Sequence, residues 1–229
     1  MASYVIATTK SWNIKNADLI AVRYPMHSFR IITDSRGLTT DTLKEISPQY
    51  VFFPHWSWII PRDIYDQFNC VVFHMTDLPF GRGGSPLQNL ILRGIYDTKI
   101  SAIKVSKGID EGDIYCKEPV NISSGNADEL FQKISSIVFD SMIPKFIEGS
   151  VAPSKQSGEP VTFKRRTPEQ SEIPGGLSQR QIYDYIRMLD GEGYPTAFQK
   201  FNGGKIFYRN ARLMEDTVYA DAEFRRDVE

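Results

Sequence analysis

The chain has 229 residues and a mass of 26.1 kDa, and its 41% hydrophobic and 24% charged residues exclude disorder as a description of the whole. The net charge of −1 argues against a protein dedicated to wrapping nucleic acid, because such binding relies on an excess of lysine and arginine. No apolar run approaches the roughly 18 residues that span a bilayer, and the first residues carry no export signal, so we expect a cytoplasmic protein without a membrane partner. Cys70 and Cys116 are too few for a disulfide framework, and we expect no metal site.

Strand-like and helix-like segments alternate over the first 150 residues. The predicted strands are 4–8, 27–33, 50–60, 70–74, 100–105 and 114–120, and the predicted helices are 39–46, 63–68, 85–95 and 126–147. Such alternation favours an α/β fold with a Rossmann-like, mostly parallel sheet. Ligands of such sheets bind beyond the carboxyl ends of the strands.

The composition changes near Val151, where proline, glycine, serine and charged residues predict a linker or surface excursion up to about residue 177. A helix is predicted over 178–189, followed over 191–224 by two or three short strands with a turn at Gly203 and Gly204. We therefore divide the chain into a domain over 1–165 and a small C-terminal extension of helix and strands over 166–229.

The stretch from Val71 to Gln88 is the most informative for chemistry. His74 stands at the end of a buried strand, where an α/β sheet places its active site, although a single histidine is more often structural. The glycine-rich segment 81–86 leads into a helix, whose first N–H groups favour anions. A plain loop is the alternative, and the segment matches neither the phosphate-loop nor the dinucleotide fingerprint.

Acidic residues cluster in the segment Lys107–Ile114, which holds Asp110, Glu111 and Asp113. Their spacing does not fit a calcium loop, so the segment is better interpreted as a turn that aims one carboxylate at a partner. If that partner is His74, the pair favours the imidazolium and fixes its orientation.

These residues carry a family resemblance. The order His74, Leu78-Pro79 and Arg82–Gln88, followed by Asp110–Ile114, resembles the folate-dependent formyltransferases, and residues 178–198 resemble the opening of their C-terminal domain. The resemblance covers about residues 45–165 and that later segment. The family acts on several amine acceptors, among them transfer RNA and amino sugars.

The resemblance implies that domain 1–165 binds N10-formyltetrahydrofolate and that an acceptor amine attacks its formyl carbon. It implies that His74 stabilises the developing oxyanion and that Asp113 holds His74. By the same resemblance, the residues that bind the folate are Trp58, Ile59, Ile60, Pro61, Lys107, Asp110 and Gly112, and those that bind the acceptor are Arg82, Gly83 and Gly84.

One position departs from the family pattern Asn-x-His, because Val72 stands two residues before His74. Residues 72 and 74 of a strand share a face, so an amide donor is lost from the site. Losing one oxyanion donor costs about 10²–10³ in rate unless another group replaces it. His55, Ser57 and Thr76 are the candidates for that replacement.

For the acceptor, the sequence favours a nucleotide-linked amino sugar, with a UDP-linked 4-amino-4,6-dideoxy hexose of the pseudaminic type as a guess. The near-neutral charge and the short C-terminal part favour this reading over transfer RNA, so we expect no nucleic-acid partner and leave a homodimer open. One alternative is methionyl-tRNA formyltransferase or a formyltransferase with another acceptor. A second alternative, encouraged by Val72, is a non-catalytic module that binds folate or a sugar.

Overall fold

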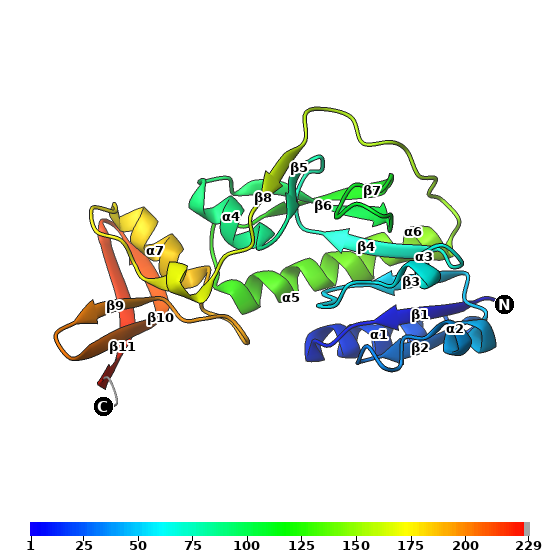
Figure 1. Cartoon of the computed structure of the whole chain (residues 1–229), viewed down its shortest axis with the longest axis horizontal. Helices are drawn as coiled ribbons and strands as arrows, with labels where there is room; N and C mark the ends of the chain where they lie inside the picture. The colour runs from blue at the N-terminus through cyan, green and yellow to red at the C-terminus, as the bar shows by residue number, and fades with distance from the viewer. Residues whose placement is uncertain (227–229) are drawn as a thin grey trace. The chain divides into compact units, whose positions relative to one another are not determined.

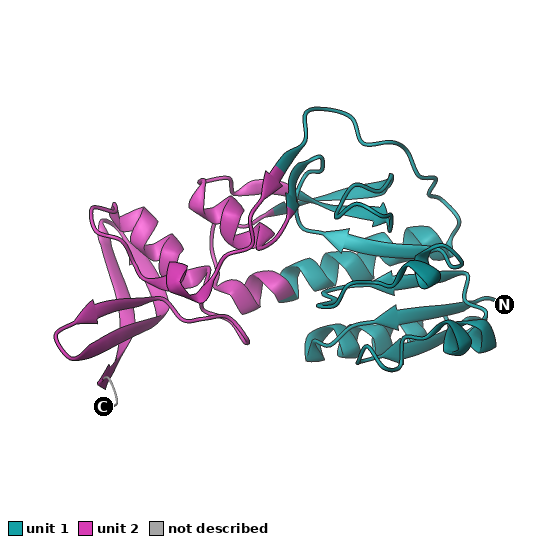
Figure 2. Cartoon of the chain, in the orientation of Figure 1, with its two compact units in different colours: residues 1–82, 99–120, 132–161 teal, residues 83–98, 121–131, 162–229 magenta. Residues whose placement is uncertain are grey.

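The computed structural model describes residues 1–226, which form two compact units (Figure 2). The first unit holds residues 1–82, 99–120 and 132–161, and the second holds residues 83–98, 121–131 and 162–229. The chain thus passes between the units several times, and the boundary predicted at residue 165 falls inside the second unit.

A six-stranded sheet with the strand order β2-β1-β3-β4-β6-β7 organises the fold (Figure 1). Its strands are β1 (Ser3–Ala7), β2 (Ser28–Ile32), β3 (Tyr50–Phe53), β4 (Cys70–His74), β6 (Asp97–Lys104) and β7 (Ile114–Asn121). The first four run parallel, whereas β6 pairs antiparallel with β4. The prediction of a mostly parallel α/β sheet is therefore confirmed.

Seven α-helices are described within residues 1–226: α1 (Ser11–Arg23), α2 (Thr40–Ile46), α3 (Arg62–Tyr65), α4 (Pro86–Leu92), α5 (Ala127–Ile137), α6 (Ile143–Ile147) and α7 (Gln179–Arg187). The sequence did not predict α1, because its exposed Leu19 and Val22 obscure the apolar stripe that marks a surface helix. The helix predicted over 126–147 is confirmed, with a π-helical turn over Val138–Met142 just before Pro144. A local change of hydrogen-bond pattern next to a proline is expected, since proline has no N–H to donate.

The stretch 50–60 is not one strand, as predicted, but β3 followed by an irregular loop. His55 has a φ of 53°, a left-handed conformation that cannot continue a strand. Two short strands that the sequence did not predict, β5 (Phe80–Gly83) and β8 (Val161–Phe163), pair with each other. The two glycines of β5 hid it, because glycine is depleted in strands.

A cluster of buried apolar side chains fills the space beneath β1, β3 and β4. Val5, Val51 and Phe53 of the strands pack there with Leu43 of α2 and Ile64 of α3. Such burial contributes about 25 cal/mol per Å² of apolar surface, so it holds these three strands in place and fixes where β4 ends.

The second unit contains the predicted C-terminal helix and strands. A capping box between Ser178 and Gln181 starts α7. The strands β9 (Phe198–Phe201), β10 (Gly204–Met214) and β11 (Thr217–Arg226) form an antiparallel sheet, with Gly203 in the left-handed conformation at the predicted turn. Within residues 1–226, no helix has both the length and the apolar character needed to span a membrane.

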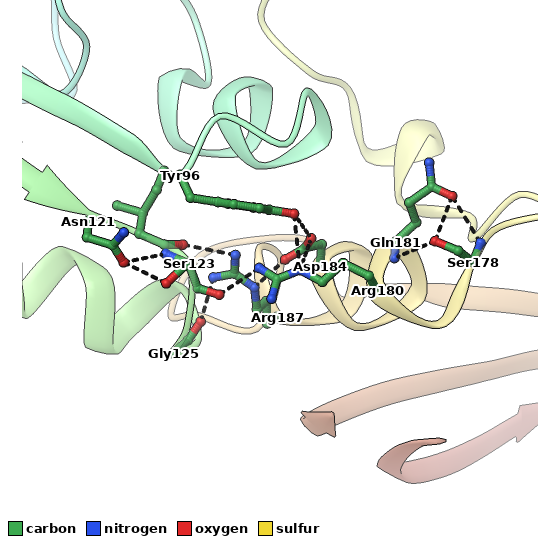
Figure 3. Close-up of polar contacts among 10 residues, drawn as sticks. Tyr96, Asn121, Ser123, Gly125, Ser178, Arg180, Gln181, Asp184 and Arg187 are labelled. Carbon is green, nitrogen blue, oxygen red and sulfur yellow. Dashed lines mark hydrogen bonds and ion pairs between the residues drawn. The ribbon is translucent and has the colours of Figure 1, made fainter. Parts of the chain in front are cut away.

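Buried charges anchor α7 inside the second unit (Figure 3). The Arg187 side chain is only 1% exposed, and its Nε atom donates to Oδ1 of Asp184 at 2.6 Å. Its Nη1 and Nη2 atoms donate to the carbonyls of Gly125 and Ile122 at 3.0 and 2.9 Å. Arg187 therefore ties α7 to the segment that leads into α5, and the Asp184 carboxylate balances its charge.

Candidate active site

The end of β4 places His74 at the candidate site. His74 is the last residue of β4 and pairs with Ser101 of β6, and its side chain is 8% exposed. The position predicted for it, at the carboxyl end of a buried strand, is confirmed.

Both ring nitrogens of His74 face an oxygen. The Nε2 atom lies 2.7 Å from the carbonyl oxygen of Gly81, which can only accept, so Nε2 carries the proton. The Nδ1 atom lies 3.4 Å from Oδ2 of Asp110, whose side chain is 13% exposed. The Asp110 carboxylate therefore faces the Nδ1 edge of the ring, opposite the Gly81 carbonyl at Nε2. The arrangement can orient the ring and supply its Nε2–H as a hydrogen-bond donor for acid–base chemistry.

The carboxylate beside the imidazole therefore belongs to Asp110, whereas the sequence had assigned that position to Asp113. Asp110 has a left-handed φ of 56°, which turns the chain so that its side chain reaches His74. Asp113 lies where the loop rejoins the sheet, and its carbonyl accepts from the Lys104 N–H at 2.8 Å. Sequence spacing does not reveal which carboxylate of such a turn points inward.

Gly112 allows the turn that carries Asp110 to pack closely against the backbone of Lys104. A Cβ atom there would lie 1.6 Å from the carbonyl oxygen of Lys104, so only glycine allows the two backbone segments to approach. Gly112 was predicted to bind the folate, and that stays a prediction. The packing against Lys104 is by itself enough to explain why this position requires glycine.

Val72 and the predicted folate-binding residues 58–61 differ in burial. Val72 shares a face of β4 with His74 and packs against the apolar cluster beneath the sheet. Of the predicted folate-binding residues, Ile60 packs against the same cluster, whereas Trp58 and Ile59 are 43% and 90% exposed. Pro61 is also exposed and caps α3.

On the loop that carries Asp110, Lys107 is exposed and the neighbouring Ile109 is 73% exposed. This loop and the 54–61 loop thus each present apolar surface to solvent, within the first unit.

The predicted acceptor residues Arg82, Gly83 and Gly84 have partners in the fold. Arg82 donates to the side-chain oxygen of Gln156 from Nε and Nη2, at 3.2 and 2.9 Å. A Cβ atom at Gly83 would lie 2.5 Å from the carbonyl oxygen of Phe163, and the Gly84 N–H donates to that same oxygen at 3.1 Å. A Cβ atom at Gly84 would lie 2.5 Å from the Cβ atom of Arg165, so close packing explains both glycines.

The structure shows a hydrogen bond of Thr76 and a ring contact of His55, two of the three residues proposed to replace the missing amide. The Thr76 hydroxyl donates to the Gly81 carbonyl at 3.4 Å, the same oxygen that His74 meets. His55 packs edge-on against Trp12, and its Nε2 atom is shielded from solvent. Burial, with a smaller effect of Lys10, lowers the pKa of His55 to about 4, so this ring is neutral at pH 7. The third residue, Ser57, is exposed.

The fold and the His74–Asp110 pair define an α/β protein with a candidate acid–base site, and comparisons with known proteins specify the class. The family model for the C-terminal domain of methionyl-tRNA formyltransferase matches residues 168–225. The structure of methionyl-tRNA formyltransferase from Clostridium thermocellum is similar with a TM-score of 0.95 and 51% identity, over 99% of this chain and 100% of that one. The chain therefore belongs to the formyltransferase family.

Other relatives are more distant. Methionyl-tRNA formyltransferase from Bacillus licheniformis is 26% identical over 175 residues, which are 72% of this chain and 54% of that protein. The chain spans about half the length of the curated relatives it matches. A 4-N formyltransferase from Francisella tularensis has a TM-score of 0.72 at 16% identity, over 91% of this chain and 97% of that one, which is a likeness of fold.

Proposed function

We propose that this protein transfers a formyl group from N10-formyltetrahydrofolate to an amine and that His74 and Asp110 carry the transfer. The observation that supports the proposal is the buried pair at the end of β4, with Nδ1 of His74 3.4 Å from the Asp110 carboxylate, in a chain of the formyltransferase family. When bound, the folate would supply the formyl group.

In this proposal, His74 holds a proton at Nε2 and presents it to the oxygen that gains negative charge as the amine attacks. The Gly81 carbonyl occupies this donor in the structure, so the substrate oxygen takes over or shares the N–H. Asp110 keeps the ring oriented through its contact with Nδ1.

The residues present fit a folate. The pterin is flat and apolar on its faces, and Trp58 and Ile59 on one loop and Ile109 on another expose apolar side chains. Val72 adds apolar surface on the same face of β4 as His74. We propose that these side chains cover the pterin.

For the acceptor we propose methionyl-tRNA. The support is the 51% identical relative and the family model, both of which carry the name methionyl-tRNA formyltransferase. These comparisons favour the alternative of the sequence analysis over its first choice, a nucleotide-linked amino sugar. The sugar stays as the second candidate because the net charge of −1 offers little general attraction for a polyanion such as transfer RNA.

The test is a transfer assay with isotopically labelled N10-formyltetrahydrofolate. The purified protein is incubated with methionyl-tRNA in one arm and with a panel of nucleotide-linked amino sugars in the other, and products are followed by mass spectrometry. Formylation of methionyl-tRNA, lost in Asp110→Asn, is the expected result. Formylation of a sugar alone would overturn the proposed acceptor, and no transfer to any amine would overturn the proposed activity.

A further inference from the structure

A segment without regular structure, residues 148–160, runs past the candidate site in the first unit. It is anchored where Ser154 pairs with Ile114 at the start of β7, through backbone hydrogen bonds of 2.7 and 2.9 Å in the two directions. Two residues further along, the half-buried Gln156 turns its side chain into the fold. From its composition, residues 151–160 belong to a stretch predicted to be a linker or surface excursion.

The amide of Gln156 uses its full hydrogen-bonding capacity. Its Nε2 atom donates to the carbonyl oxygens of Asp110 and Gly112, at 2.8 Å each. Its Oε1 atom accepts from Nε and Nη2 of Arg82. Because carbonyls require a donor and a guanidinium requires an acceptor, these partners fix the amide in one orientation.

These partners lie on both sides of the His74 ring. Asp110 and Gly112 belong to the turn that brings a carboxylate to Nδ1, and Arg82 follows Gly81, whose carbonyl meets Nε2. Gln156 thus connects the two backbone segments between which the imidazole is held. Arg82 adds an ion pair of 3.5 Å to Glu111 in the middle of the same turn.

We infer that Gln156 is a positioning residue: it holds the 110–112 turn against Arg82 and thereby sets the Asp110 carboxylate against His74. Asp110 adopts a left-handed backbone, which glycine adopts more readily than other residues, so contacts that hold the turn in place matter for its conformation. The two bonds from Gln156 are such contacts. The effect on turnover rests on the proposed function, whereas the effect on the geometry of His74 does not.

The direct test measures the His74 ring by nitrogen-15 nuclear magnetic resonance, with the signal assigned through His74→Gln. In Gln156→Ala, the Nδ1 and Nε2 resonances of His74 should shift, because the carboxylate is no longer held in place. Lys155→Ala is the matched control, since Lys155 is the exposed neighbour on the same segment, and it should leave the resonances where they are. Unchanged His74 resonances in a folded Gln156→Ala protein would overturn the inference.

A second variant separates this role from general loss of structure. Gln156→Glu keeps an oxygen for Arg82 but removes both N–H donors, so it should shift the His74 signals as Gln156→Ala does. Wild-type signals in a folded Gln156→Glu protein would contradict the assigned role of the two donated bonds.

The kinetic test uses the transfer assay. Gln156→Ala should lower kcat about 10- to 100-fold with little change in KM, because misplacing a catalytic group mainly affects the reacting step. In an Asp110→Asn background the same substitution should cost almost nothing more, since it acts through Asp110. Full additivity would overturn the inference. Absence of transfer in the wild type would refute the proposed function instead, and the resonance test would still stand.

Discussion

Nδ1 of His74 lies 3.4 Å from Oδ2 of Asp110, and both side chains are largely shielded from solvent. The contact joins the end of β4 to a turn that follows β6, two places that are 36 residues apart in the chain (110 minus 74). Two polar side chains that face each other in a largely buried place, at the end of a strand of an α/β sheet, make this contact the candidate site.

The first prediction separates the two carboxylates of the turn. Asp110→Asn should lower kcat of formyl transfer by about 10²–10⁴, the usual contribution of acid–base assistance, because His74 loses the charge at Nδ1. Asp113→Asn should cost much less. Steady-state kinetics of both variants decides, and a larger loss in Asp113→Asn would restore the assignment made from the sequence.

The second prediction concerns the tight turn. Gly112→Ala should lower kcat and move the His74 resonances, because a methyl group 1.6 Å from the Lys104 carbonyl forces the loop that carries Asp110 to shift. Gly175→Ala is the control, since nothing lies within 4 Å of a Cβ atom there. Equal activity of the two variants would show that the turn tolerates displacement.

The sequence predicts the strands that end at the site well, because Tyr50–Phe53 and Cys70–His74 are apolar runs bounded by turn residues. It also identifies His74 and the acidic turn. It does not identify which acid faces the ring, because that depends on the left-handed backbone of Asp110 rather than on spacing. The role of Gln156 is equally hidden, since its Nε2 atom donates to backbone carbonyls and its side-chain partner Arg82 is 74 residues away in the chain.

The third prediction tests the anchor of α7. Arg187→Ala should lower the free energy of unfolding by about 3–5 kcal/mol, because it leaves two carbonyls and part of the Asp184 charge without their donor in a buried place. Urea unfolding followed by circular dichroism measures it. Arg36→Ala is the control, with a side chain that is 90% exposed in its pair with Asp34, and it should leave the free energy of unfolding close to that of the wild type.

The fourth prediction concerns acid stability. Burial lowers the pKa of His55 to about 4 from its ordinary 6.5, so below pH 6.5 the unfolded chain takes up a proton that the folded chain does not. The free energy of unfolding should therefore fall as the pH drops from 6.5 to 4, by about 3 kcal/mol from this residue.

Replacement of that residue isolates its contribution. His55→Asn removes the titrating group, and asparagine tolerates the left-handed φ of 53°. Urea unfolding at several pH values between 4 and 7 should show a shallower decline for this variant than for the wild type. Parallel declines would mean that other groups account for the pH dependence.

The most direct measurement is mass spectrometry of methionyl-tRNA after incubation with labelled N10-formyltetrahydrofolate and either the wild-type protein or His74→Gln. We predict one labelled formyl group on the methionine amine with the wild type, and a yield with His74→Gln that falls at least about 100-fold. Equal yields from the two proteins would contradict the role given to the imidazole at the end of β4.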